Sequence, residues 1–305
     1  MRTPAARLPR PASAALGILL DQLAGEPPAA LHPVVHFGRA MEGAEKELYR
    51  DGVVAGLAHT AVGVALGITG GVLVGSTAVA TALAVGGRAL AHAAQDVGSA
   101  LAAGDEDRAR SLLPALVGRD TTQLTTAEMA RATVESVAEN TVDAIVAPAL
   151  WAAVAGAPGA LGYRAVNTMD AMVGHHSDRY DRYGRASARL DDAANWVPAR
   201  CTAALVALVR PRAARAIRRA VAIQAPSHPS PNAGVAEAAF AAALGIRLGG
   251  TNRYGDRIEE RPQLGHGREA EAEDITRAVR LCRDVATALA VTLGLAGMAR
   301  WRTGR

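Results

Sequence analysis

Apolar runs alternate along the chain with strongly polar segments, and no stretch shows the period of two that marks a half-buried strand. Runs of about 20 apolar residues match a helix that crosses the hydrocarbon core of a bilayer. We therefore expect an all-α fold, a polytopic membrane helical bundle with long polar helical segments at the membrane edge. No internal repeat is evident, so a single domain over residues 1–305 is expected. Its candidate spans lie near residues 12–24, 53–75, 77–101, 144–163, 193–209 and 285–302.

The longest uncharged run, residues 52–87, gives the strongest membrane signal because it contains no Asp, Glu, Lys or Arg. As one helix it would measure about 54 Å, whereas the hydrocarbon core is about 30 Å thick, so two helices are expected. Glycine recurs at every fourth position within the run, which predicts a ridge of small residues that lets another helix approach closely. These glycines are Gly63, Gly67, Gly71 and Gly75.

Two further apolar runs are interrupted. Residues 144–163 carry no charge, but Pro148 and Pro158 are expected to kink or end this helix because proline removes a helical hydrogen bond. Irregular backbone at membrane depth often lines a cavity. The run at residues 12–20 is short and meets Asp21, so we expect an interfacial or re-entrant helix rather than a cleaved signal.

Residues 131–148 form the polar stretch around which the chain is organised. Read as a helix, the stretch places Glu135, Glu139 and Asp143 on one face, because they follow one another at intervals of four. Like charges at this spacing repel, so three stacked carboxylates require a bound cation or cationic neighbours. Divalent cations such as Mg²⁺ prefer oxygen ligands. A solvated acidic face with Arg131 and another arginine as partners explains the same spacing, and both interpretations stay open.

A second polar set follows within residues 164–200, the most polar long segment. Asn167 and Asp170 are three residues apart. Arg189, Asp192 and Asn195 follow one another in steps of three, so these side chains can share a helix face. The segment is therefore a second candidate for binding chemistry.

The composition narrows the classes of function. Hydrophobic residues make up 50% of the chain and aromatic residues 3%, so the apolar content is mainly Ala, Val and Leu, which suits close helix contacts. Lys46 is the sole lysine, which leaves one poor candidate for a lysine nucleophile. The basic residues are not interleaved with aromatic residues, as nucleic-acid binding would favour. Cys201 and Cys282 are isolated and predict neither a disulfide framework nor a zinc site.

A glycine-rich segment at residues 245–265 carries several arginines, among them Arg247 and Arg261. Its backbone N–H groups and guanidinium groups are suited to holding phosphate, and an ordinary surface loop is the alternative. The chain has no G-x-x-x-x-G-K-[ST] loop, no G-x-G-x-x-G after a strand and no G-x-S-x-G turn. Nucleotide binding would therefore need a different kind of site.

Seven polar motifs, found in order over residues 19–265, together resemble the CbiB/CobD family of cobalamin biosynthesis. The motifs are LLDQLAGEPPAALHPVVHFGR, VGRDTTQL, ATVESVAENTVDAIVAP, GYRAVNTMDAMVGH, ARLDDAANWVPAR, SHPSPNAG and GIRLGGTNRYG. The resemblance implies an integral membrane enzyme, adenosylcobinamide-phosphate synthase. Its implied reaction is ATP-dependent amide formation between adenosylcobyric acid and (R)-1-aminopropan-2-yl phosphate or aminoethyl phosphate, which gives adenosylcobinamide phosphate.

The resemblance also implies ATP and Mg²⁺ as cofactors, with the corrinoid as a substrate. It places the protein in the inner or plasma membrane as a multi-pass protein whose active site faces the cytoplasm. The expected partners are the two substrates, membrane lipid and other membrane-associated enzymes late in the cobalamin pathway. Nucleic acid is not among them.

Residue roles follow from the resemblance as hypotheses. Catalytic roles are expected for Glu135, Glu139, Asp143 and Asp192, and tentative Mg²⁺ ligands are Glu139 and Asp143. Substrate binding is expected for His32, Arg39, Arg119, Asn140, Asn167, Asp170, Arg189, Asn195, His228 and Asn232. Within this set the arginines would contact phosphate and the histidines would hydrogen-bond to substrate. The group of Asn167, Asp170 and Asp192 is expected to face the first acidic set.

Two other classes of protein fit parts of the pattern. A polytopic transporter or channel would use the acidic helix as an ion or substrate pathway, since ionisable residues within a membrane often mark such routes. A soluble helical binding protein is favoured by the mean hydropathy of +0.11 and by the proline breaks. Release from membranes by carbonate without detergent would support the soluble class, and ATP-dependent condensation would support the ligase.

Overall fold

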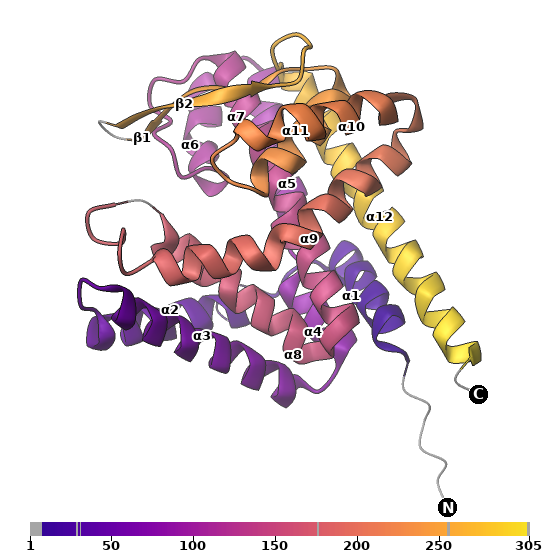
Figure 1. Cartoon of the computed structure of the whole chain (residues 1–305). Coiled ribbons are helices and arrows are strands. Elements are labelled where there is room, and N and C mark those ends of the chain that lie inside the picture. Colours follow the sequence, from indigo (N-terminus) through magenta and orange to yellow (C-terminus); the bar gives the residue numbers. More distant parts are fainter. Residues whose placement is uncertain (1–7, 29, 31, 176, 255–256, 304–305) are drawn as a thin grey trace, which may run out of the picture. The chain divides into compact units, whose positions relative to one another are not determined.

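The computed structural model describes residues 8–28, 30, 32–175, 177–254 and 257–303 (Figure 1). Its helices are α1 Arg10–Ala24, α2 Pro33–Leu48, α3 Val53–Val74, α4 Thr77–Ala84, α5 Gly87–Ala102, α6 Glu106–Leu112, α7 Thr126–Thr141, α8 Ala147–Met169, α9 Arg185–Val209, α10 Ala214–Ile223, α11 Ala233–Leu244 and α12 Ala272–Thr303. Two strands, β1 Leu248–Tyr254 and β2 Arg257–Leu264, form one antiparallel hairpin. The expected all-α class with helices able to span a membrane is confirmed apart from this hairpin.

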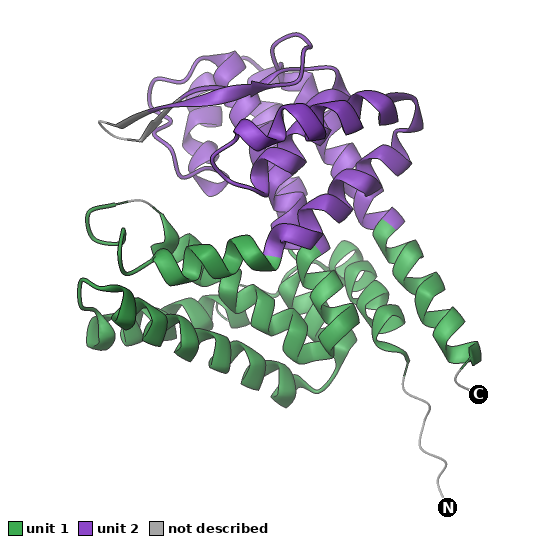
Figure 2. Ribbon diagram, viewed as in Figure 1, with its two compact units in different colours: residues 1–86, 147–194, 289–305 green, residues 87–146, 195–288 purple. Residues whose placement is uncertain are grey.

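The chain forms two compact units, coloured separately in Figure 2. Unit 1 comprises residues 1–86, 147–194 and 289–305, and unit 2 comprises residues 87–146 and 195–288. The points at which the chain passes between units include positions inside α9 and α12. Each unit therefore draws its elements from separate parts of the sequence.

In unit 1, helix α8 packs against α1, α3 and α4, and the glycine ridge of α3 explains its close contact with α8. A Cβ atom at Gly63 would lie 2.1 Å from the Met169 sulfur, and one at Gly71 would lie 2.5 Å from the Ala157 carbonyl oxygen. The predicted ridge is confirmed for these positions and for Gly67. The fourth glycine has another use, since Gly75 ends α3 in the left-handed conformation with φ +66°.

The break in α8 falls at Gly156 rather than at either proline. Gly156 has φ +71° and ψ −152°, a conformation open to glycine, and the helix resumes through Pro158. The interruption frees carbonyl groups of the preceding turn, and Arg10 donates a hydrogen bond of 2.9 Å to the Val154 carbonyl oxygen. Pro148 does not end the helix either, since it lies in the first turn of α8, directly after the π-helical turn Val142–Val146.

In unit 2, helix α7 packs against α5 and α11, and the β-hairpin contacts both α7 and α11. The hairpin pairs Gly250 with Arg261 and has an irregular register between Leu248 and Gly250. Both glycines at this irregularity are left-handed, with φ +84° at Gly249 and +96° at Gly250. The sequence does not indicate this hairpin, because its two segments, LGGTNRY and RIEERPQL, lack a regular alternation of apolar and polar residues.

Among the residues that the structure describes, three helical stretches are long and apolar enough to cross a membrane. They are Val53–Val74, Thr126–Gly174 and Ala272–Thr303, and they contain the spans expected near 53–75, 144–163 and 285–302. The other expected spans are not among them. The candidate at 77–101 is divided into α4 and α5 because the backbone is extended at Val85, and the one at 12–24 is a helix of 15 residues. The candidate at 193–209 lies within α9.

The α3–α8 contact can be tested with two glycines of the same helix. A Cβ atom at Gly67 would lie 2.6 Å from Ala165 Cβ and 2.7 Å from the Leu161 carbonyl oxygen, whereas one at Gly70 would meet nothing closer than 3.8 Å. Gly67→Ala is therefore expected to destabilise the protein by about 1–3 kcal/mol through overpacking. The control, Gly70→Ala, should not destabilise it. Thermal unfolding in detergent measures both, and equal midpoints for the two variants would contradict the close approach.

Candidate functional site

Helix α7 carries the central acidic residues of unit 2. It begins at a capping box in which the Thr125 hydroxyl accepts the Glu128 N–H, and the Glu128 carboxylate accepts the Thr125 N–H at 2.8 Å. Glu135 and Glu139 lie one turn apart, but Glu135 is buried and Glu139 is exposed. Asp143 follows in a π-helical turn, Val142–Val146, and is half-buried. The three carboxylates therefore lie in three different environments.

A buried ion pair fixes Glu135. Arg119 Nη2 lies 2.7 Å from Glu135 Oε2, and the two side chains are 5% and 6% exposed. The other carboxylate oxygen, Oε1, accepts the Gly249 N–H at 2.9 Å. For Glu135 the alternative of a solvated acidic face is wrong, and its partner is Arg119 rather than Arg131. Glu135 thus connects α7 to the segment before it and to β1.

A second buried carboxylate, Glu237 on α11, lies in the same unit and is 1% exposed. Within the part of the chain that the structure describes, neither of its carboxylate oxygens accepts a hydrogen bond. The nearest cationic or titratable nitrogens are His228 Nε2 at 3.7 Å and Arg261 Nη1 at 4.0 Å. Burial raises the pKa of Glu237 well above its usual value, and the negative charges of Glu135 and Glu139 raise it further. The site therefore favours the protonated form of Glu237.

His228 is buried against this carboxylate. Its Nδ1 lies 3.1 Å from both the N–H and the carbonyl oxygen of Ser230, and its Nε2 lies 3.7 Å from Glu237. Burial lowers the pKa of His228, and the positive charge of Arg261 acts in the same direction. The imidazole is therefore neutral, and it cannot supply a full counter-charge to Glu237.

The loop that carries His228 is held by an arginine. Arg200 Nη1 donates to Asn232 Oδ1 at 2.9 Å, and Arg200 Nη2 donates to the Pro231 carbonyl oxygen at 3.1 Å. The Arg200 guanidinium also stacks over Trp196, 4.4 Å from its ring centroid. Asn232, which the sequence predicts to bind substrate, thus lies in a loop whose shape depends on Arg200.

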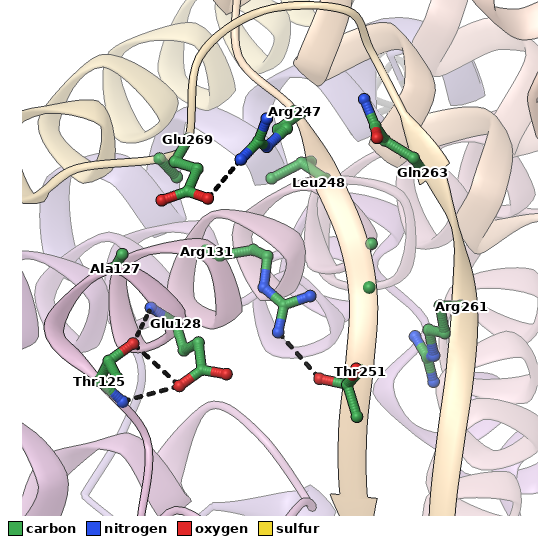
Figure 3. A pocket seen from close by; sticks show the side chains of 13 residues that line it. Thr125, Ala127, Glu128, Arg131, Arg247, Leu248, Thr251, Arg261, Gln263 and Glu269 are labelled. Carbon is green, nitrogen blue, oxygen red and sulfur yellow. Dashed lines mark hydrogen bonds and ion pairs between the residues drawn. The ribbon is translucent and has the colours of Figure 1, made fainter.

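A pocket of about 640 Å³ opens beside these residues, between the first turns of α7 and the hairpin (Figure 3). Its wall includes Arg131, Arg247 and Arg261 together with the backbone of Gly249 and Gly250. Arg131 reaches from α7 to β1 and donates to the Thr251 carbonyl oxygen at 3.0 Å, as Figure 3 shows. The pocket and the buried carboxylate share Arg261.

The sequence comparisons settle the family. The family described as CobD/Cbib protein matches residues 14–282. The chain belongs to the CobD/CbiB family. It is 48% identical over 289 residues to cobalamin biosynthesis protein CobD of Mycobacterium tuberculosis strain H37Rv, an alignment that covers 90% of this chain and 92% of that one. No solved structure matches the chain.

Two less similar relatives carry the same name. Cobalamin biosynthesis protein CobD of Chromobacterium violaceum is 44% identical over 288 residues, with 87% of this chain and 90% of the relative covered. Cobalamin biosynthesis protein CobD of Klebsiella pneumoniae is 39% identical over 316 residues, with 94% and 96% covered. The pathway expected from the seven motifs, cobalamin biosynthesis, is therefore confirmed.

The remaining expected site residues of this CobD/CbiB chain lie mostly in unit 1. Asn167 Nδ2 donates to Asp191 Oδ1 at 3.4 Å, and Asp170 begins a second π-helical turn, Asp170–Gly174. His32 Nδ1 accepts the Val34 N–H at 3.2 Å and so caps α2. Of these residues His32 is buried, Asn167, Asp170 and Asp192 are half-buried, and Arg39 and Arg189 are exposed. That the second acidic set faces the first stays a prediction.

Two asparagines of unit 2, which the sequence predicts to bind substrate, are bonded within their own helix or buried. Asn140 Nδ2 donates back to the Ser136 carbonyl oxygen at 3.0 Å, and Asn195 is buried. Among the residues that the structure describes, no three His, Cys, Asp or Glu side chains lie close enough together to hold a metal ion. The tentative Mg²⁺ ligands Glu139 and Asp143 therefore stay a prediction.

Sequence reasoning missed Glu237 and an internal repeat. Glu237 is the sole acidic residue of the apolar helix α11, and a lone charge in such a helix was the available signal. The repeat is N-T-x-D-A-x-V, which occurs at residues 140–146 and again at residues 167–173. Each copy contains one expected aspartate, Asp143 or Asp170, within a π-helical turn. The expectation that the chain has no internal repeat is therefore wrong.

The Arg119–Glu135 pair gives a stability prediction. Glu135→Gln keeps an acceptor for the Gly249 N–H but leaves the buried Arg119 charge without its partner, which should cost about 3–5 kcal/mol. Removing both charges with Arg119→Leu and Glu135→Gln should restore part of that loss. The control is Arg210→Gln, which breaks the more exposed pair with Asp284. This variant should lose only about 0–1 kcal/mol of unfolding free energy. Similar losses at both pairs, measured by denaturant unfolding, would argue against a buried pair.

The raised pKa of Glu237 gives a pH prediction. The folded state binds this proton more tightly than the unfolded state, so the free energy of unfolding falls as pH rises above the usual carboxyl value of 4.5. Glu237→Gln mimics the protonated form and should raise the unfolding temperature, more at pH 8 than at pH 5. The exposed Glu271→Gln serves as the control and should show no such trend. A Glu237→Gln protein that is less stable at pH 8 would contradict the assignment.

Proposed function

We propose that the protein is an adenosylcobinamide-phosphate synthase. It joins the propionate carboxylate of adenosylcobyric acid to the amine of (R)-1-aminopropan-2-yl phosphate or aminoethyl phosphate, with consumption of ATP. Membership of the CobD/CbiB family supports the pathway. The observation that carries the proposal for this chain is the buried, poorly compensated carboxylate of Glu237 beside Glu135 and Glu139.

The reaction sets two requirements. A carboxylate is a poor acyl donor, and ATP supplies the phosphoryl group that turns it into an acyl phosphate with a good leaving group. The amine, an ammonium ion in water, must lose one proton before its lone pair attacks the acyl carbon. Phosphate then leaves, and a second proton leaves the nitrogen as the amide forms. The protein must therefore provide a base near a cation-binding face.

Glu237 has the properties of that base. A general base works best when its pKa lies near the working pH, and burial shifts the Glu237 carboxyl in that direction. Glu139, one turn along α7 from Glu135, is the cation-binding carboxylate of this proposal. His228 Nε2 lies 3.7 Å from Glu237, and the Arg119–Glu135 pair, with the Gly249 N–H, fixes α7 against the hairpin. These roles divide the acidic residues into one base, one cation-binding group and one structural anchor.

The residues present also suit Mg²⁺ carried in with phosphate. Mg²⁺ commonly uses one or two protein carboxylates and completes its shell with phosphate oxygens and water. Glu139 and Asp143 would hold it, and the ion would neutralise phosphate charge when bound. The three apolar helices suit a multi-pass protein of the inner or plasma membrane, and we propose that the active site faces cytoplasmic ATP. Membrane lipid and other late-pathway enzymes are the expected partners.

Condensation in detergent tests the proposal. Purified protein with adenosylcobyric acid, the aminoalcohol phosphate, ATP and Mg²⁺ should form adenosylcobinamide phosphate, detected by mass spectrometry. Glu237→Gln should lower kcat by about 10²–10⁴-fold and remove the rise of activity with pH that deprotonation of this base produces. Glu139→Gln should lower turnover and change its Mg²⁺ dependence. Exposed Glu271→Gln is the control.

Several outcomes would contradict the proposal. The absence of any ATP-dependent product from the folded wild-type protein would favour a transporter instead. Near-normal turnover of Glu139→Gln with normal Mg²⁺ dependence would remove that residue from the site. An unchanged pH profile in Glu237→Gln would show that another group takes the proton.

A further inference from the structure

The pocket of unit 2 has the size and lining of a small-molecule site. Its volume of about 640 Å³ lies within the range of about 300–1,000 Å³ that such sites occupy. The wall is drawn from α7, the segment before β1, both strands and residues 269–270, so separate parts of unit 2 must fold together to make it. A pocket assembled in this way has a fixed shape, which suits specific binding.

Its cationic groups come from three different elements. Arg131 belongs to α7, Arg247 precedes β1 and Arg261 lies on β2. Two carboxylates also line the pocket, and Glu259 lies 3.2 Å from Arg261 Nε, so part of this positive charge is compensated. Glu128 is engaged by the Thr125 backbone and hydroxyl at the start of α7. Glu269 pairs with Arg247, but both side chains are largely exposed, and such pairs are weak enough for an anion to replace the carboxylate.

The glycine pair of β1 positions Arg131. A Cβ atom at Gly250 would lie 2.8 Å from Arg131 Nη1, so a side chain there would displace the guanidinium. Without one, Arg131 lies against the strand, and its Nη2 donates to the Thr251 carbonyl oxygen. A guanidinium has five N–H donors in a planar fork, so this single bond orients the group and leaves donors for a ligand.

The geometry points to a binding site for the phosphate group of a small molecule, with Arg131, Arg247 and Arg261 as its cationic ligands. Arginine forks bind phosphate through paired, charge-assisted hydrogen bonds. Arg261 is shared with the buried carboxylate, since its Nη1 lies 4.0 Å from Glu237 Oε1. A phosphate bound on the pocket side of Arg261 would therefore lie next to the proposed base.

The identity of the ligand rests on the proposed function, which offers two phosphate-bearing molecules. One is the nucleotide ATP, and the other is the aminoalkyl phosphate. Both present a phosphate group to the three arginines, so the lining of the pocket does not distinguish them. Binding measurements with each molecule on the same arginine variants do distinguish them.

Binding to the full-length protein in detergent tests the site. Isothermal titration would use ATP, O-phosphoethanolamine and inorganic phosphate as probes, each with and without Mg²⁺. Arg131→Gln and Arg247→Gln should each weaken at least one organic probe by about tenfold or more, the usual effect of losing a charge-assisted bond. The matched control is Arg210→Gln, because Arg210 also pairs with a carboxylate, Asp284, but does not line the pocket. It should bind all probes as the wild type does.

Two further variants keep the test valid if Arg131→Gln disturbs the hairpin. Arg131→Lys retains the charge but loses the fork, and should bind with an intermediate affinity. Gly250→Ala keeps all three arginines in the sequence, but its Cβ atom would displace the Arg131 guanidinium, which should weaken binding too. The φ of +96° at this position disfavours alanine, so weaker binding counts only if the unfolding temperature of this variant matches that of the wild type. Unfolding temperatures of all variants identify those that remain folded, and the comparison is made among these.

The outcomes separate the ligands and the hypotheses. Loss of ATP affinity in the arginine variants identifies a nucleotide site, and loss of O-phosphoethanolamine affinity identifies a site for the aminoalkyl phosphate. If no probe binds the wild type, or if folded Arg131 and Arg247 variants bind as the wild type does, the site is overturned. Condensation assays on the same samples distinguish a failure of the phosphate site from a failure of the proposed synthase function. Product formation with arginine-insensitive binding refutes the pocket alone, and arginine-sensitive binding without product refutes the synthase alone.

Discussion

The buried pair of Arg119 and Glu135 is the constraint on which the candidate site of unit 2 depends. A charge removed from water is costly unless it is paired and fully hydrogen-bonded, and Glu135 meets this condition with Arg119 on one oxygen and the Gly249 N–H on the other. The same carboxylate therefore fixes the segment before α7, α7 itself and the start of β1. The arginine pocket is lined by elements that this pair joins, and α11, which carries Glu237, packs against α7.

Around that anchor, unit 2 places opposite electrostatic environments side by side. Glu237 is kept in a poorly compensated environment, where burial and two nearby carboxylates favour its protonated form. The pocket gathers arginines that favour an anion. Arg261 belongs to both, because its guanidinium lines the pocket and lies within 4.0 Å of Glu237. A ligand that carries both an ammonium group and a phosphate group has matching charges for the two environments.

The sequence predicts those features that depend on residues only a few positions apart. The four-residue glycine spacing of α3 is such a local pattern, and the structure confirms the close helix approach at Gly63, Gly67 and Gly71. The partner of Glu135 was not predictable, because Arg119 lies in an irregular segment whose path depends on tertiary packing. The hairpin escaped prediction because its two segments lack a regular alternation of apolar and polar residues. Glu237 was predictable in principle, since a lone acid in an apolar helix requires an explanation.

The repeated N-T-x-D-A-x-V motif has a consequence for insertions and deletions. A π-helical turn accommodates one residue more than an α-helical turn, and each residue of a regular helix advances the chain by about 100°. Deleting one residue from Val142–Val146 would turn this wide turn into a regular α-helical turn and remove the local geometry that holds Asp143. Deleting one residue from the regular part of α7 would instead rotate all the helical residues that follow by about 100°. Two such turns, each with an aspartate, make the spacing of the chain itself a determinant of where its acidic groups lie.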